Sequence, residues 1–130
     1  MIIIDTHIWI WWTHDINRLN NVQSETLNDN ETNIIGVSAI SCWEIAKLLE
    51  YGKIELSCPI EEWFQKALSY PGVKLIPITP EIAIESTRLP CGFHKDPADQ
   101  LIVATARVFC CPLVTSDKKI LAYKHVKTIG

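Results

Sequence analysis

Residues 1–12 read MIIIDTHIWIWW, and the fold depends on the pattern in this stretch. Three consecutive isoleucines are typical of a short strand buried on both faces, as in a parallel sheet. Asp5 follows them directly, and the apolar residues after it predict a helix over 7–15. Burying a charge is costly unless it is paired or bound to a metal ion. Asp5 is therefore either an ordinary strand exit or part of a site that other segments complete.

The rest of the chain continues the alternation of strand and helix. Short apolar runs bounded by turn residues predict further strands at 33–38, 72–78, 111–117 and 126–130. Helical spacing and start signals predict helices at 38–51, 59–68, 79–89, 95–109 and 118–125, whereas 20–31 is a polar helix or a loop. This alternation predicts an α/β fold with a central, mostly parallel sheet of four to five strands flanked by helices.

Length and composition indicate a folded domain without a membrane span. The chain has 130 residues, 48% of them hydrophobic, which argues against disorder and predicts one domain over 1–130. No apolar run approaches the roughly 20 residues that cross a bilayer. The first residues lack a basic segment and a cleavage site, so we expect no secretory signal and a cytoplasmic protein.

The cysteines, histidines and net charge limit the kinds of site that the chain can form. Five cysteines without a CxxC pair, in a chain without a secretory signal, predict reduced core thiols. The four histidines are scattered, which argues against zinc. A net charge of −3 does not favour nucleic-acid binding, but a group of metal-binding carboxylates would carry much of that charge.

Four acids are predicted to meet at one edge of the sheet. Asp5 and Asp117 each follow a strand, and Glu44 and Asp99 lie in the early turns of helices. Ligand sites in such folds lie outside the carboxyl ends of the strands, where the following helices begin. We therefore expect these four carboxylates to lie along the same edge.

A carboxylate cluster of this kind favours metal chemistry. Like charges raise one another's pKa, so the cluster is unfavourable without a cation. Oxygen ligands suit hard ions such as Mg²⁺ or Mn²⁺. One or two such ions can activate a water and stabilise the leaving oxygen of a phosphodiester, which makes phosphodiester hydrolysis the natural reaction.

Each acid also has a local explanation. Asp96 is predicted to be a helix N-cap, and Asp99 at the third helical position could interact with the helix dipole. Ser41 and Glu44 have the spacing of a capping box, and Asp117 could cap the helix that follows it.

Hydroxyl side chains stand beside the acids in the sequence. Thr6 follows Asp5, Ser38 ends the second predicted strand, and Thr115 and Ser116 precede Asp117. These hydroxyls could orient a carboxylate or a bound water, or they could make only local capping and turn hydrogen bonds.

Four blocks in this order, IIIDTHIWIWW, SAISCWEIAKL, HKDPADQLIVATA and LVTSDKKI, resemble a PIN domain of the VapC toxin type over essentially the whole chain. The resemblance implies a three-layer α/β sandwich. It also implies a Mg²⁺- or Mn²⁺-dependent endoribonuclease, the toxin of a type II toxin–antitoxin system, which hydrolyses RNA with a metal-activated water. Asp5, Glu44 and Asp99 would be the core metal-binding and catalytic triad, with Asp117 as a fourth member. Asp96 would be an extra acid near the mouth.

The same resemblance implies protein partners. VapC-type proteins usually form homodimers and are neutralised by a small VapB-like antitoxin, whose C-terminal segment lies in a groove and often brings a basic side chain to the acids. Trp9, Trp11, Trp12 and Trp43 are candidates for that groove or for the dimer face, because Trp is enriched at interface hot spots. The alternative is that at least two of them belong to the core.

The chain departs from the family pattern at Gln100, where many relatives carry an arginine. Gln cannot supply charge to screen the acids or contact phosphate. Five residues could supply it instead, or be ordinary solvated side chains: Lys47, His94, Lys95, Lys118 and Lys119.

Two other functions fit the same pattern of residues. One is an RNA-processing PIN nuclease without an antitoxin, and another is a non-catalytic PIN-like module that binds RNA or protein. A phospho-receiver domain is disfavoured because only one aspartate follows the first strand and none ends the strand at 72–78.

Overall fold

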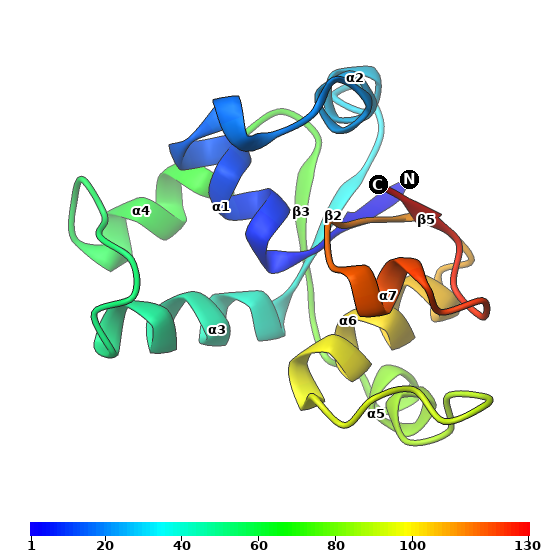
Figure 1. The fold of residues 1–130 in the computed structure, drawn as a ribbon. Helices are drawn as coiled ribbons and strands as arrows, with labels where there is room; N and C mark the ends of the chain where they lie inside the picture. The colour runs from blue at the N-terminus through cyan, green and yellow to red at the C-terminus, as the bar shows by residue number, and fades with distance from the viewer.

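A five-stranded parallel sheet forms the centre of the computed structural model, which describes residues 1–130 (Figure 1). The strand order is β3–β2–β1–β4–β5, and every neighbouring pair is parallel. The strands are β1 (Ile2–Ile4), β2 (Ile35–Ser38), β3 (Val73–Ile76), β4 (Leu113–Val114) and β5 (Thr128–Ile129). The predicted α/β class and parallel sheet are confirmed.

Helices cover both faces of this sheet, which gives the three layers of the sandwich (Figure 1). They are α1 (Thr6–His14), α2 (Asn21–Asp29), α3 (Ala39–Glu50), α4 (Ile60–Ala67), α5 (Pro80–Ser86), α6 (Pro97–Val108) and α7 (Lys118–Leu121), with a 3₁₀ turn at Ile16–Arg18. Each predicted helix is present. The undecided segment 20–31 contains α2, because Asn20 and Gln23 form a reciprocal capping box at its start.

Strand β1 lies between β2 and β4 and contributes to the core on both faces. Ile2 and Ile4 belong to the hydrophobic cluster with α1, α2 and α4, and Ile3 belongs to the cluster with α5, α6 and α7. Successive side chains of a strand point to opposite faces, so three consecutive apolar residues are required here. This burial fixes the position of the residue that follows, Asp5.

The tryptophans of α1 are divided between the core and the surface. Trp9 and Trp12 are buried, and Trp9 packs edge-on against Trp63 of α4 with 5.3 Å between ring centroids. Trp11 is half-buried, and Trp43 on α3 is 55% exposed. The prediction that at least two of these tryptophans belong to the core is confirmed.

One local expectation needs adjustment, and another is confirmed. The strand predicted at 111–117 is limited to β4, because Thr115 turns the chain out of the sheet by accepting a hydrogen bond from the backbone N–H of Asp117 (3.0 Å). Helix α3 ends as predicted before Gly52, whose φ of +67° is the left-handed conformation that glycine adopts readily. No helix is long and apolar enough to cross a membrane.

Gly36 in β2 provides a test of the sheet packing. A methyl group at this position would lie 2.6 Å from Cδ1 of Ile3 and 3.1 Å from Cγ1 of Ile76, both in the buried core. We expect Gly36→Ala to lower the free energy of unfolding by about 1–3 kcal/mol, measured by urea denaturation, because the interior has no room to relax.

Gly52→Ala is the matched control. Its added methyl would meet nothing within 4 Å, so it reports the cost of the positive φ alone. A Gly36→Ala protein as stable as the wild type would contradict the close packing of β1, β2 and β3.

Candidate functional site

Asp5 lies at the carboxyl end of β1 and is the N-cap of α1. Its Oδ1 accepts a hydrogen bond from the backbone N–H of His7 (2.9 Å), and its Oδ2 accepts one from the hydroxyl of Thr115. The side chain is only 6% exposed, and this burial raises the pKa of Asp5 even though both hydrogen bonds favour the charged form. Asp5 therefore has a structural role as the N-cap of α1, and its carboxyl also lies buried at the edge of the sheet.

Glu44 is held by a contact between α1 and α3. The hydroxyl of Thr6 donates to Oε1 of Glu44 (2.6 Å) and lies 2.8 Å from the hydroxyl of buried Ser41. The capping box predicted for Ser41 and Glu44 is wrong, because Ser38 is the N-cap of α3 and accepts from the N–H of Ile40. The pKa of Glu44 is raised because the side chain is partly buried, and the hydrogen bond from Thr6 opposes this effect only in part.

Asp99 lies in the first turn of α6. Asp96 is the N-cap of this helix, as predicted, and its Oδ1 accepts from the backbone N–H of Asp99 (3.0 Å). Oδ2 of Asp99 lies 3.1 Å from Nε2 of His94, although that nitrogen makes no hydrogen bond of good geometry. The Asp99 side chain caps no helix, so the start of α6 does not account for its position in the site.

The pKa of Asp99 is raised from 3.8 to about 7. Burial is the largest cause, and the negative charges of neighbouring acids add to it. Those acids are Asp96, Asp117, Asp5 and Glu44. The four predicted site residues therefore act on one another electrostatically at the same edge of the sheet.

Asp117 is the N-cap of α7, as predicted. Its Oδ1 accepts from the backbone N–H groups of Lys119 (2.9 Å) and Ile120 (3.0 Å). Together with Asp5 it lines a pocket of about 200 Å³ in front of the sheet edge, which His7, Trp11 and Ser116 complete.

Gln23 is a buried polar residue of the site that sequence reasoning missed. It is 1% exposed, and its Nε2 donates to the hydroxyl of Ser116 (2.6 Å), which ties α2 to the segment between β4 and α7. The only signal in the sequence was the spacing of Asn20 and Gln23, which indicates a helix start and not a contact 93 residues away.

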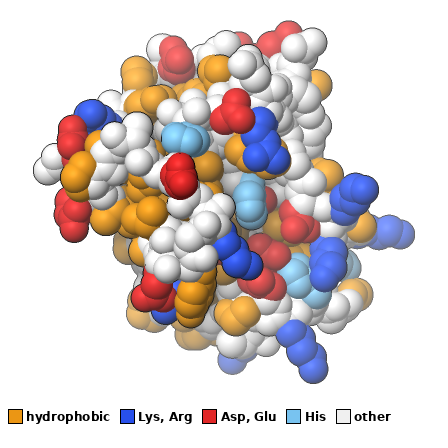
Figure 2. All heavy atoms as spheres, turned by 60° about the vertical axis from the view of Figure 1, so that its left-hand side comes forward, with side chains coloured by type: hydrophobic (Ala, Val, Ile, Leu, Met, Phe, Trp, Pro, Cys, Tyr) orange, Lys and Arg blue, Asp and Glu red, His pale blue; other side chains and the backbone are white.

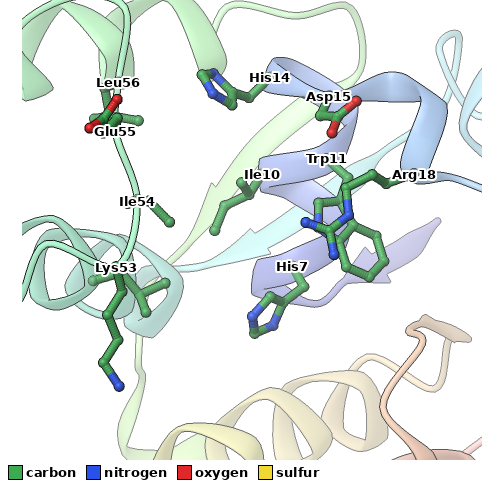
Figure 3. Close-up of a pocket in the computed structure, with 11 residues that line it drawn as sticks. His7, Ile10, Trp11, His14, Asp15, Arg18, Lys53, Ile54, Glu55 and Leu56 are labelled. Atoms are coloured by element: carbon green, nitrogen blue, oxygen red, sulfur yellow. The ribbon is translucent and has the colours of Figure 1, made fainter.

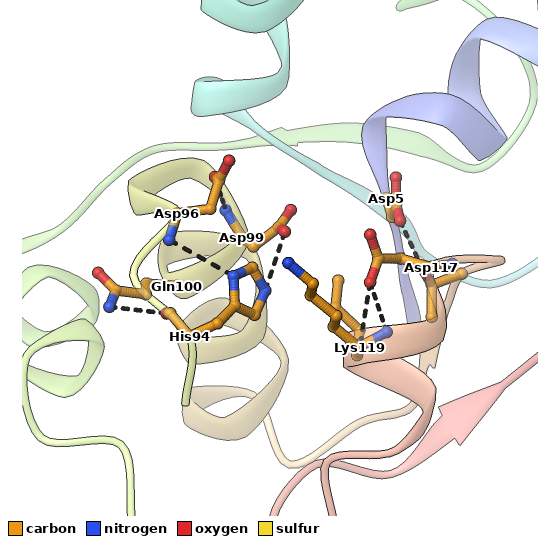
Figure 4. Close-up of polar contacts among 9 residues, drawn as sticks. Asp5, His94, Asp96, Asp99, Gln100, Asp117 and Lys119 are labelled. Atoms are coloured by element: carbon orange, nitrogen blue, oxygen red, sulfur yellow. Dashed lines mark hydrogen bonds and ion pairs between the residues drawn. The ribbon is translucent and has the colours of Figure 1, made fainter. Parts of the chain in front are cut away.

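Of the five residues that could supply positive charge in place of Gln100, only some lie beside the acids. His94 contacts Asp99, and Figure 4 shows Lys119 extending between Asp99 and Asp117. Lys47 instead pairs with Glu50 at 3.0 Å. Gln100 anchors the loop before α6, because its Nε2 donates to the carbonyl of His94 (3.1 Å). Figure 2 shows acidic side chains grouped on one face with histidine and basic side chains beside them.

The site brings the carboxylates to one edge without assembling a coordination shell. No three His, Cys, Asp or Glu side chains lie together in a way that could hold one ion, and Asp99 faces His94 while Asp5 and Asp117 lie across the site (Figure 4). The available donors are carboxylate oxygens with raised pKa, which is the donor chemistry that suits a hard divalent cation. The roles of Asp5, Glu44, Asp99 and Asp117 in metal binding stay predictions.

Residues 2–126 match the family model described as PIN domain. The chain belongs to the PIN domain family. It is 33% identical over 128 residues to Ribonuclease VapC22 of Mycobacterium tuberculosis, which covers 98% of this chain and 95% of that protein. The resemblance to VapC-type PIN domains is thereby confirmed.

Solved structures with the same fold are more distant in sequence. VapBC2 from Rickettsia felis, bound to a promoter DNA fragment, contains a chain with a TM-score of 0.71 and 20% identity, covering 99% of this chain and 98% of that one. FitAcB from Neisseria gonorrhoeae contains one with a TM-score of 0.70 and 19% identity, covering 100% and 97%. These likenesses confirm the PIN fold.

The raised pKa of Asp99 makes the stability of this PIN domain depend on pH. Between pH 3.8 and about 7 the folded protein retains a proton that the unfolded chain has lost, so this carboxyl costs increasing stability as the pH rises through that range. In metal-free buffer we expect Asp99→Asn to be more stable than the wild type at pH 8, with little difference near pH 4. Urea midpoints at both pH values measure this.

Asp29→Asn, which removes the same charge from an exposed position on α2, is the control. An Asp99→Asn protein that is less stable than the wild type at pH 8 would show that the Asp99 carboxylate is not destabilised by its surroundings.

Proposed function

We propose that this PIN domain is a metal-dependent endoribonuclease and the toxin of a type II toxin–antitoxin system. The observation that carries the proposal is the group of four carboxyls, Asp5, Glu44, Asp99 and Asp117, at the carboxyl edge of the sheet, three of which have raised pKa values. Excess negative charge of this kind is stabilised by a divalent cation. The relative from Mycobacterium tuberculosis bears the name ribonuclease, which supports RNA as the substrate.

Asp5, Glu44, Asp99 and Asp117 are the residues that would hold Mg²⁺ or Mn²⁺. A divalent ion held there would act as a Lewis acid toward the charge that develops on the cut phosphate. Asp5 and Glu44 are pre-oriented for this role by the hydroxyls of Thr115 and Thr6. Asp99 must turn from His94 if it is to share an ion with them.

The chain's own groups also suit a phosphodiester substrate. His94 lies against Asp99, and Lys119 extends between Asp99 and Asp117 and supplies the positive charge that Gln100 lacks (Figure 4). In the metal-free protein the Asp99 carboxyl has a pKa of about 7, so it gains or loses its proton near neutral pH.

The partners follow from the same proposal. Solved relatives are described as VapBC bound to DNA in Rickettsia felis and Salmonella typhimurium, which supports a VapB-like antitoxin for this chain. We extend the proposal to a homodimer that acts on RNA in the cytoplasm. A small open reading frame next to the gene would favour the toxin over an RNA-processing nuclease.

Cleavage of total RNA by the purified protein tests the proposal. We expect cleavage that requires Mg²⁺ or Mn²⁺, that EDTA abolishes, and that falls by about 100-fold or more in Asp99→Asn, because a residue at the metal matters at least as much as its outer-shell partners. Asp99 is the cleanest position because its side chain caps no helix. Asp5→Asn should be similarly inactive.

Asp29→Asn is the matched control and should cleave like the wild type, since Asp29 is exposed at the end of α2. Equal cleavage by the wild type and Asp99→Asn would overturn the assignment. RNA binding without metal-dependent cleavage would support the non-catalytic alternative instead.

A further inference from the structure

A second cleft opens next to the acidic pocket, between α1 and the segment that follows α3 (Figure 3). It has a volume of about 330 Å³, which lies within the range of small-molecule sites. Trp11 and Arg18 line one side, residues 53–56 line the other, and Ile10 and Leu48 add apolar surface. The cleft is therefore large enough and apolar enough for a flat ring.

This cleft adjoins the proposed catalytic site. His7 and Trp11 line both the cleft and the smaller pocket that contains Asp5 and Asp117. A chain molecule held at the acids therefore meets Trp11 and His7 as it leaves them. A polymer such as RNA would place a neighbouring nucleotide in the cleft.

Trp11 and Arg18 form a cation–π contact on the wall of the cleft. The guanidinium carbon of Arg18 lies 4.9 Å from the Trp11 ring centroid, and the His7 ring lies 6.0 Å from it on a tilted plane. Arg18 is exposed and forms no ion pair with a carboxylate. Trp9 and Trp12 fill the buried face of α1, and Trp11 packs against the edge of this core with part of its ring left exposed to the cleft.

The charged side chains around the cleft are two basic and two acidic. Arg18 and Lys53 lie on its two sides with two histidines, His7 and His14, against two acids, Asp15 and Glu55. Nucleobases stack on tryptophan and arginine, and phosphates attract basic side chains. The Trp11 ring and the boundary that the cleft shares with the acidic pocket, and not the net charge of the cleft, favour a nucleotide of the bound RNA as the occupant.

We infer that this cleft is a nucleotide subsite, in which the base next to the cut phosphate stacks at Trp11 and Arg18. This inference rests on the proposed ribonuclease function and names how the substrate is held beside the acids. The RNA is single-stranded at this position, because a base must be unstacked from its neighbours to enter the cleft.

An abasic scan combined with Trp11→Ala tests the subsite. Asp99→Asn protein, which should bind RNA without cutting it, is titrated with a fluorescent single-stranded oligonucleotide that spans a mapped cleavage site. We expect one abasic position, within two nucleotides of that site, to weaken binding by about 5- to 100-fold. Adding Trp11→Ala should weaken binding of the intact RNA by a similar factor and make the abasic change silent, because both remove the same stack.

Two controls separate stacking from folding and from general charge. Trp11→Phe keeps an aromatic face and should retain most of the affinity, and circular dichroism checks the fold of each variant. Arg18→Ala should lower the slope of log affinity against log salt by about 0.7, whereas Arg88→Ala, which removes an exposed arginine just after α5 that does not line the cleft, should leave it unchanged.

Four results would overturn the inference. If the abasic position lowers the RNA affinity equally with and without Trp11→Ala in the Asp99→Asn protein, the base lies elsewhere. Unchanged RNA binding by Trp11→Ala, with weakened binding of a small antitoxin-like protein, would assign the cleft to a protein partner. A protein that neither binds nor cuts RNA would overturn the proposed function as well, whereas metal-dependent cleavage with no role for Trp11 would overturn the subsite alone.

Discussion

The parallel pairing of β1 between β2 and β4 is the constraint on which the rest of the structure depends. Because both partners run in the same direction as β1, the chain leaves all three strands at one edge, and the helices that follow begin there. Asp5 and Asp117 are placed by the ends of β1 and β4, and Glu44 by the helix after β2. Residues far apart in the sequence thus become neighbours without any direct bond between them.

Capping and charge repulsion act together on the acids at this edge. Asp5, Asp96 and Asp117 each accept hydrogen bonds from the first backbone N–H groups of a helix, which helps to keep carboxyls at a crowded edge. Asp99 has no such role, and its pKa is the one raised to about 7. The local and functional explanations of these acids are therefore compatible.

Local signals were sufficient to predict most of the fold, and three-dimensional contacts explain what they missed. Thr79 and Pro80 marked the start of α5, and three isoleucines marked a strand buried on both faces. The sequence could not reveal that Thr6 orients Glu44 across 38 residues. The spacing of Ser41 and Glu44 indicated a capping box, but Ser38 is the N-cap of α3 and Ser41 is buried against Thr6.

The central claim is that the four carboxyls form one cation site once Asp99 turns toward the others, since in this structure the side chains do not surround one point. A crystal structure of the protein grown with Mn²⁺, with anomalous scattering recorded at the manganese edge, tests it most directly. The account predicts an anomalous peak coordinated by Asp5 and Asp99 together with Glu44 or Asp117, and a side chain of Asp99 turned away from His94. Full Mn²⁺ occupancy elsewhere, with Asp99 still on His94, would contradict it.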